Sequence, residues 1–302
     1  MAPVLFVSHG APTFALEPGK LGADLRKLGQ AVVAADVGFP TSTTALSPPP
    51  PSSSSSTCNS RSNNNTTHHR IRAILVISAH WLTSKPSCPT IQTHSTPSTI
   101  YDFGGFDEAL YQLQYPAMGP PPEIVKRTAD CLVQAGWDVQ FDNERGYDHG
   151  VWVPLLHMFP EANIPVFQVS MPRDLTPARA FELGRALAPL RRHEGIFIVG
   201  SGGTTHNLFE GLRNPSIAPA SPKAIEFAKW VRKCVLANDS NSLMNYKSLA
   251  PHAEWAHPSL EHYLPLLVAM GASSSQLDDE KVQVMEGGYT YGVLAMDAYL
   301  WG

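Results

Sequence analysis

The chain alternates between short, uninterrupted apolar runs and longer segments in which apolar residues recur with helical spacing. Apolar runs rich in β-forming residues occupy positions 4–7, 71–77, 166–170 and 196–199. Helical spacing covers positions 20–37, 121–135, 177–190, 222–237 and 259–270, with Ser259 as the predicted N-cap of the last segment. Strands that are apolar throughout are typical of parallel sheets buried on both faces. The pattern therefore predicts an α/β fold, with a mostly parallel central sheet flanked by helices on both faces.

One stretch, at about residues 41–70, interrupts this alternation. It consists mainly of Pro, Ser, Thr and Asn and has few apolar side chains. Such a segment buries too little apolar surface to offset the entropy lost on ordering its backbone. We therefore predict a disordered insertion inside one catalytic domain that spans residues 1–302, and not a boundary between two domains.

Composition narrows the functional classes. The 302 residues carry a formal net charge of −4, so no basic surplus exists to bind phosphates, and nucleic-acid partners are disfavoured. The four cysteines are far apart without a C-x-x-C pair, which is typical of free thiols in a reducing compartment. No run reaches the roughly 20 apolar residues of a membrane span. We expect a soluble cytoplasmic protein, either a monomer or a homodimer.

Histidines follow three of the predicted strands. His9 and His80 follow the ends of two apolar runs closely, and His206 follows a third run after a glycine-rich segment. Ligands of open α/β sheets bind beyond the carboxyl ends of the strands, so these side chains are expected to share one site. Imidazole is the commonest metal ligand and the usual acid or base near neutral pH. The repeated position favours a common site over three unrelated strand-end histidines.

Two further segments carry candidate groups. His149 lies in a predicted polar loop at 146–150, where it is either an oriented active-site imidazole or part of an ordinary turn. Residues 256–263 place two histidines and a carboxylate at a predicted helix start, and either His262 or Glu261 could complete a metal site.

Several common catalytic motifs do not fit the sequence. The glycine-rich residues 200–203 resemble a phosphate-binding turn but have neither the P-loop spacing nor its lysine. The G-x-S-x-G nucleophile motif and the HExxH zinc motif are absent from the sequence.

Six segments in the same order resemble a known family. They are residues 8–12, 78–81, 100–106, 147–152, 201–208 and 257–266. Together they resemble the class III extradiol ring-cleavage dioxygenases of the LigB-like superfamily, and within it the 4,5-DOPA dioxygenase extradiol group. The resemblance extends over nearly the whole chain outside the predicted insertion.

The resemblance implies roles for individual residues. His9 and His80 match two metal-binding histidines, and His262 falls at the position of a third ligand. His206 matches a histidine that serves as a further metal ligand or as an acid/base. His149 matches an active-site histidine that binds substrate or moves protons.

The same resemblance implies one divalent metal ion, Zn²⁺ or Fe²⁺, with Fe²⁺ expected for turnover, and O₂ as co-substrate. The expected substrate is a small catecholic aromatic such as L-DOPA. Two alternatives remain open at this stage. One is a zinc hydrolase that uses the same histidines, with Glu261 as a candidate general base. The other is a non-catalytic metal-binding protein.

Overall fold

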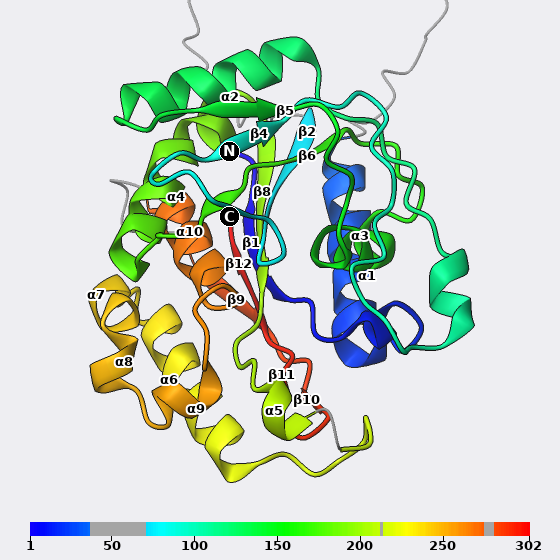
Figure 1. Cartoon of the computed structure of the whole chain (residues 1–302), viewed down its shortest axis with the longest axis vertical. Coiled ribbons are helices and arrows are strands. Elements are labelled where there is room, and N and C mark those ends of the chain that lie inside the picture. Colours follow the sequence, from blue (N-terminus) through cyan, green and yellow to red (C-terminus); the bar gives the residue numbers. More distant parts are fainter. Residues whose placement is uncertain (37–70, 212–213, 275–280) are drawn as a thin grey trace, which may run out of the picture.

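The fold is described from a computed structural model that covers residues 1–36, 71–211, 214–274 and 281–302. The predicted insertion at about 41–70 lies outside the described residues. Figure 1 shows a central sheet, seen nearly edge-on, with helices on either side of it.

The central sheet has six strands in the order β6-β2-β8-β1-β12-β9. Four neighbouring strands are parallel, namely β1 (Val4–Ser8), β2 (Ala73–Ser78), β6 (Val166–Gln168) and β8 (Ile196–Gly202). The antiparallel edge consists of β9 (Val282–Met285) and β12 (Ala298–Trp301). The predicted mostly parallel sheet is therefore confirmed, whereas the two antiparallel strands were not predicted.

Helices cover both faces of the sheet, as predicted (Figure 1). One face carries α2 (Pro122–Gln134), α4 (Pro177–His193) and α10 (Leu264–Ser273), and the other carries α1 (Gly19–Asp36) and α3 (His149–Met158). A separate helical group contains α6 (Pro222–Leu236), α7 (Ser240–Met244), α8 (Tyr246–Leu249) and α9 (Ala253–Ala256). The remaining elements are short: α5 (Leu208–Gly211), η1 (Pro12–Ala15), η2 (Glu108–Gln112), β3 (Leu82–Thr83), β4 (Thr90–Gln92), β5 (Gln140–Asp142), β7 (Met171–Pro172), β10 (Tyr289–Thr290) and β11 (Leu294–Ala295).

The strands are apolar throughout because the sheet separates two hydrophobic cores. In β1, Val4 and Phe6 belong to the core beneath α4 and α10, whereas Leu5 and Val7 belong to the core beneath α1 and α3. Successive side chains of a strand point to opposite faces, so both sets are buried. This double burial explains why the sequence showed continuous apolar runs instead of alternation.

Two predicted boundaries were wrong. The helix predicted to start at Ser259 begins at Leu264, and the Ser259 hydroxyl bonds the Glu261 carboxylate instead. The predicted loop at 146–150 ends earlier than expected, because α3 already begins at His149. In both cases contacts between residues far apart in the sequence, and not the local sequence pattern, decide where the helix begins.

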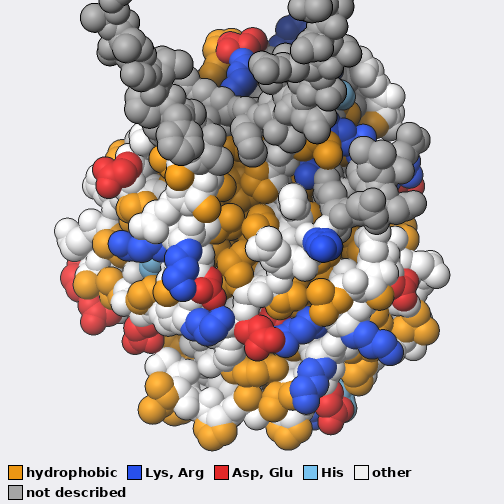
Figure 2. All heavy atoms as spheres, turned by 180° about the vertical axis from the view of Figure 1, so that it is seen from behind, with side chains coloured by type: hydrophobic (Ala, Val, Ile, Leu, Met, Phe, Trp, Pro, Cys, Tyr) orange, Lys and Arg blue, Asp and Glu red, His pale blue; other side chains and the backbone are white. Residues whose placement is uncertain are grey.

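The surface carries charges of both signs. On the face shown in Figure 2, Lys and Arg side chains are interspersed with Asp, Glu and apolar groups. Among the described residues, no helix combines the length and apolar character needed to cross a bilayer.

Helices α4 and α10 approach so closely that their contact requires glycine. A Cβ on Gly184 would lie 2.0 Å from the carbonyl oxygen of Val268, and one on Gly271 would lie 2.1 Å from that of Phe181. Both distances are far inside van der Waals contact with backbone atoms, which cannot move aside as a flexible side chain can. The pair of glycines therefore sets how tightly α10 packs against α4.

We expect Gly184→Val to lower the free energy of unfolding by about 2 kcal/mol or more, because overpacking would force the two helices apart. The matched control is Arg185→Val, at an exposed position of the same helix, which should cost about 0.5 kcal/mol or less. Urea unfolding monitored by circular dichroism measures both. Equal midpoints for the two variants would contradict the predicted packing.

Candidate active site

The site lies where three adjacent parallel strands end. Strand β8 runs between β1 and β2, with Ser8 paired to Gly202 and Ser78 paired to Ser201. This register makes the carboxyl ends of the strands level. His9 follows β1 directly and His80 follows β2 after one residue, so both imidazoles emerge at the same edge.

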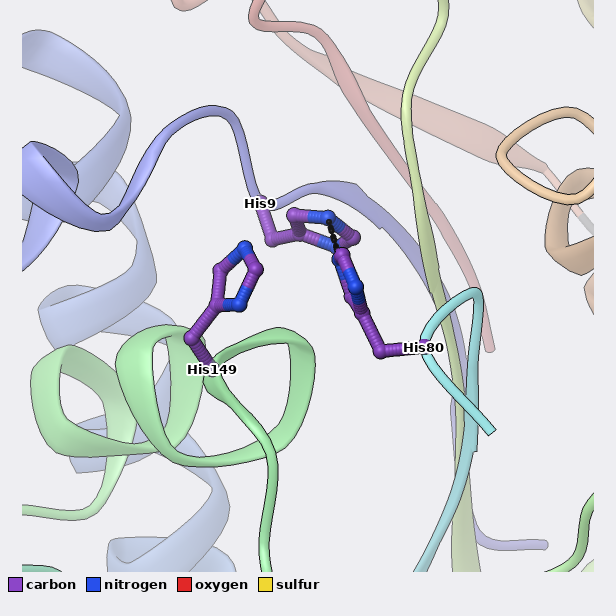
Figure 3. Close-up of side chains that lie close together, drawn as sticks. All are labelled: His9, His80 and His149. Atoms are coloured by element: carbon purple, nitrogen blue, oxygen red, sulfur yellow. Dashed lines mark hydrogen bonds between the residues drawn. The ribbon is translucent and has the colours of Figure 1, made fainter. Parts of the chain in front are cut away.

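Figure 3 shows the side chains of His9, His80 and His149, which come from distant parts of the sequence and face one another there; their ligand atoms lie within 4.8 Å of one another. Nε2 of His9 lies 3.0 Å from Nε2 of His80, which in turn lies 3.3 Å from Nε2 of His262. His149 projects from the first turn of α3, and its ring centroid is 4.1 Å from that of His80. We refer to His9, His80 and His262 as the histidine triad.

The other nitrogen of each ring of the histidine triad lies close to an acceptor oxygen. Nδ1 of His80 lies 3.3 Å from the Asp102 carboxylate, and Nδ1 of His262 lies 3.2 Å from the Glu261 carboxylate. Nδ1 of His9 lies 2.9 Å from the hydroxyl of Ser201. Partners of this kind fix the tautomer and orientation of metal-binding imidazoles.

These partners place the ring proton on Nδ1. Ionised carboxylates only accept hydrogen bonds, so the Nδ1 atoms of His80 and His262 must be donors. The Ser201 hydroxyl donates its proton to the carbonyl oxygen of Gly150 and therefore accepts from His9. We assign Nε2 as the unprotonated nitrogen in all three rings.

The local environment keeps the triad neutral. Burial lowers the pKa of His80 to about 4 and lowers the pKa values of His9 and His262 well below their usual range, with further lowering by neighbouring histidines. Burial opposes ionisation of Asp102 as well, yet the hydrogen bond from the His149 side chain holds the pKa of that carboxyl below its usual range. At neutral pH, three bare nitrogens therefore face each other beside an ionised carboxylate.

This arrangement fits a metal ion. Metal–nitrogen bonds of about 2.0–2.1 Å separate adjacent ligand nitrogens by about 3.0 Å in octahedral and about 3.4 Å in tetrahedral coordination. The two measured Nε2 separations, 3.0 Å and 3.3 Å, span that interval. Lone pairs this close repel one another unless a cation lies between them. The chemistry of the donor set therefore matches a divalent ion.

His206 lies in the same site but in a different orientation. Its ring stacks on that of His262, with centroids 3.4 Å apart and planes 7° from parallel. Ligand atoms of His206, Glu261 and His262 lie within 4.8 Å of one another, but the lone pairs of the two parallel rings lie in separate planes. Burial lowers the pKa of His206 to about 4, so this imidazole is neutral at pH 7.

The glycines at the end of β8 have a packing role. A Cβ on Gly200 would lie 2.2 Å from the carbonyl oxygen of Pro265, and one on Gly202 would lie 2.3 Å from that of His262. The backbone N–H of Gly203 donates to the carbonyl oxygen of His262. The segment that resembled a phosphate-binding turn instead lets the chain carrying His262 approach the sheet.

His257 is a buried residue whose role the sequence did not indicate. Its Nε2 lies 2.9 Å from the carbonyl oxygen of Thr204, so this contact ties residues 257–263 to the segment that carries His206. The backbone N–H of His206 also donates to the carbonyl oxygen of Ala256. These contacts explain why the helix predicted from Ser259 starts late.

A cavity of about 610 Å³ opens directly onto the histidines. Its floor includes His80, His149, His206 and His262. Most of its remaining wall is apolar and is formed by Ala11, Pro12, Phe103, Phe106, Leu208, Val293 and Leu294. The volume and the apolar lining are those of a site for a small organic molecule.

Comparisons with known proteins agree with this geometry. The family profile of the catalytic LigB subunit of aromatic ring-opening dioxygenase matches residues 54–299. A 4,5-DOPA dioxygenase extradiol of Beta vulgaris is 39% identical over 229 residues, or 76% of this chain and 82% of that protein. One from Escherichia coli K12 is 33% identical over 298 residues, or 97% and 92%. The crystal structure of an uncharacterized Escherichia coli K12 protein aligns over 100% of both chains, with 28% identity and a TM-score of 0.70.

The fold and the histidine cluster thus define an aromatic ring-opening dioxygenase. The chain belongs to the LigB family, as the sequence resemblance predicted, and it is an extradiol dioxygenase. Membership implies a non-haem metal and a small aromatic substrate, and it favours the dioxygenase interpretation over the hydrolase alternative.

The stability that buried His257 contributes is expected to depend on pH. Burial lowers its pKa from 6.5 to about 3. As the pH falls, the unfolded chain therefore binds the proton first. The stability that neutral His257 contributes is fully present above about pH 6.5 and is lost progressively as the pH falls toward about 3.

We expect His257→Gln, which keeps an N–H donor but does not titrate, to flatten the slope of unfolding free energy against pH. The reduction should approach one proton, about 1.4 kcal/mol per pH unit, between about pH 6 and 4. Urea unfolding of chelator-treated protein measures the slope, with His193→Gln at an exposed position as the control. An unchanged slope in His257→Gln would contradict the lowered pKa of buried His257.

Proposed function

We propose that this extradiol dioxygenase cleaves a catecholic substrate such as L-DOPA, with Fe²⁺ held by the histidine triad and O₂ as co-substrate. The observation that carries the proposal is the close approach of Nε2 of His80 to Nε2 of His9 and to Nε2 of His262, at a cavity lined by His80 and His262. Relatives named 4,5-DOPA dioxygenase extradiol support the choice of substrate.

The proposed reaction adds both atoms of O₂ across one carbon–carbon bond of the ring. The bond that breaks lies beside the two hydroxyl-bearing carbons, not between them. One oxygen atom becomes part of a carboxylate at one end of the opened ring, and the other becomes the aldehyde oxygen at the other end. A catechol therefore gives a hydroxymuconic semialdehyde. No further oxidant or reductant is required. With L-DOPA the ring-opened product would cyclise spontaneously.

The metal ion, when bound, supplies coordination positions for the catechol oxygens and O₂, and the electron transfer that activates oxygen. The triad nitrogens fit both Zn²⁺ and Fe²⁺, but Zn²⁺ has no redox chemistry. Turnover therefore calls for Fe²⁺. His9, His80 and His262 would hold the ion, each through Nε2.

His149 and His206 are the proposed acid/base residues. Nδ1 of His149 donates to Asp102 at 2.9 Å, and His149 lines the cavity, so Nε2 is the ring nitrogen available for proton transfer. That nitrogen can accept a proton from a catechol hydroxyl as the substrate binds. His206 lines the same cavity and, given its stacked orientation, serves better as an acid/base than as a fourth ligand.

The apolar wall suits an aromatic ring. Phe103 meets His149 edge-on, with centroids 5.7 Å apart, and Phe106 meets Phe103 at 5.7 Å in the same manner. An aromatic substrate can continue this edge-to-face arrangement, which contributes about 0.5–1.5 kcal/mol per ring pair beyond simple burial. The loop 100–106 is therefore the proposed substrate contact.

The proposal predicts oxygen uptake by purified protein reconstituted anaerobically with Fe²⁺ and then given L-DOPA or simpler catechols. We expect stoichiometric uptake and a yellow product in the visible spectrum, both abolished in His80→Ala because a triad nitrogen is lost. No uptake with any catechol at full iron occupancy would contradict the proposal. Uptake with other catechols but not with L-DOPA would overturn only the named substrate.

A second variant separates metal binding from proton transfer. We expect His149→Gln to retain bound iron but to lower kcat by a factor of about 10² to 10⁴, the usual contribution of a general acid or base. Metal analysis and steady-state kinetics measure the two effects, with His80→Ala as the variant that loses both. Loss of iron from His149→Gln would instead identify His149 as a ligand.

A further inference from the structure

Asp102 contacts the rings of two active-site histidines. One of its oxygens, Oδ2, lies 3.3 Å from Nδ1 of His80. The other, Oδ1, lies 2.9 Å from Nδ1 of His149 and 3.0 Å from the backbone nitrogen of the same residue. It therefore connects a proposed metal ligand, the proposed acid/base and the start of α3.

The position of Asp102 is fixed by the backbone around it. The N–H of Ile100 donates to the carbonyl oxygen of Tyr147 at 2.7 Å, and the indole of Trp152 donates to the carbonyl oxygen of Ile100 at 3.2 Å. These bonds fasten the loop 100–106 to both sides of the α3 N-terminus. They therefore hold the backbone that carries Asp102 beside His149.

We propose that Asp102 is a positioning residue that holds His80 and His149 in the tautomer with the proton on Nδ1. This inference rests on the proposed function, because it assumes that His80 binds metal through Nε2. A carboxylate can do this for two rings, since both of its oxygens are acceptors. An amide cannot, because it offers one acceptor and one donor group.

The geometry indicates which ring an amide would disturb. The oxygen facing His149 accepts hydrogen bonds from two N–H groups, whereas the oxygen facing His80 has only the 3.3 Å contact with Nδ1. In Asp102→Asn, the amide oxygen would therefore face His149 and the NH₂ group would face Nδ1 of His80. To avoid two opposed donors, His80 would have to move its proton to Nε2 or turn its ring. Either change withdraws the Nε2 lone pair from the metal position.

Removing the side chain should be less harmful than replacing it by an amide. In Asp102→Ala, Nδ1–H of His80 would be free to donate to water in the space left behind, and Nε2 would stay unprotonated. A role that depended only on charge predicts equal losses, since both variants are neutral. A role that depended only on packing predicts the opposite order, since Asn keeps the shape of Asp and Ala does not. The ranking of the two variants therefore tests the tautomer itself.

The experiment measures Co²⁺ or Zn²⁺ affinity by chelator competition for wild type, Asp102→Asn and Asp102→Ala. We expect Asp102→Asn to bind about 10- to 100-fold more weakly than wild type, as loss of such a partner typically does, with Asp102→Ala between the two. The visible bands of bound Co²⁺ report the ligand set without any turnover. Equal affinities, or a weaker Asp102→Ala, would overturn the proposal.

A measurement on the unaltered protein covers the case in which a variant fails to fold. The imidazole ¹⁵N shifts of metal-free wild type should place the proton on Nδ1 of both His80 and His149. A proton on Nε2 of His80 would refute the proposal whatever the variants do. A wild type that binds no metal would instead refute the proposed function, so the two failures can be told apart.

Discussion

The three Nε2 atoms at the centre of the site can remain together only while each imidazole keeps its proton on Nδ1. Three different acceptors enforce this, namely the Asp102 and Glu261 carboxylates and the Ser201 hydroxyl. A protonated Nε2 in any ring would place a hydrogen in the space that a metal occupies. The metal chemistry of this site therefore depends on polar contacts made on the far side of each ring.

The fold supplies these acceptors from separate elements. Ser201 belongs to the central strand β8, so His9 is fixed directly to the sheet. Glu261 precedes α10, whose packing against α4 depends on two glycines without room for a Cβ. Asp102 lies in a loop that also forms the cavity wall. The site thus combines the central sheet, a tightly packed helix and a loop of the cavity wall. Burial keeps the imidazoles of the triad neutral.

The sequence predicted those features that depend on local pattern. Continuous apolar runs indicated a doubly covered parallel sheet, and the strand-end positions of His9, His80 and His206 indicated one shared site, since parallel strands end at one edge. Ser259 was a misleading helix cap because the start of α10 is decided by contacts between residues 203–206 and 256–262.

Long-range pairings were not predictable in this way. Asp102 caps the start of α3 across 47 residues of sequence, so a polar loop was expected where His149 begins a helix. The motif around Asp102 was noticed through the family resemblance, but no periodicity or spacing connects it to His80. The two antiparallel strands at the sheet edge likewise depend on pairing between residues 282–285 and 298–301.

The central claim, that this chain inserts both atoms of O₂ beside a catechol, is tested most directly by isotope labelling. Iron-loaded protein would be given L-DOPA under ¹⁸O₂, and the product reduced at once, before its carbonyl exchanges with water, and analysed by mass spectrometry. The account predicts two labelled oxygen atoms in each product molecule. A ring-opened product that carries one labelled atom or none would contradict it.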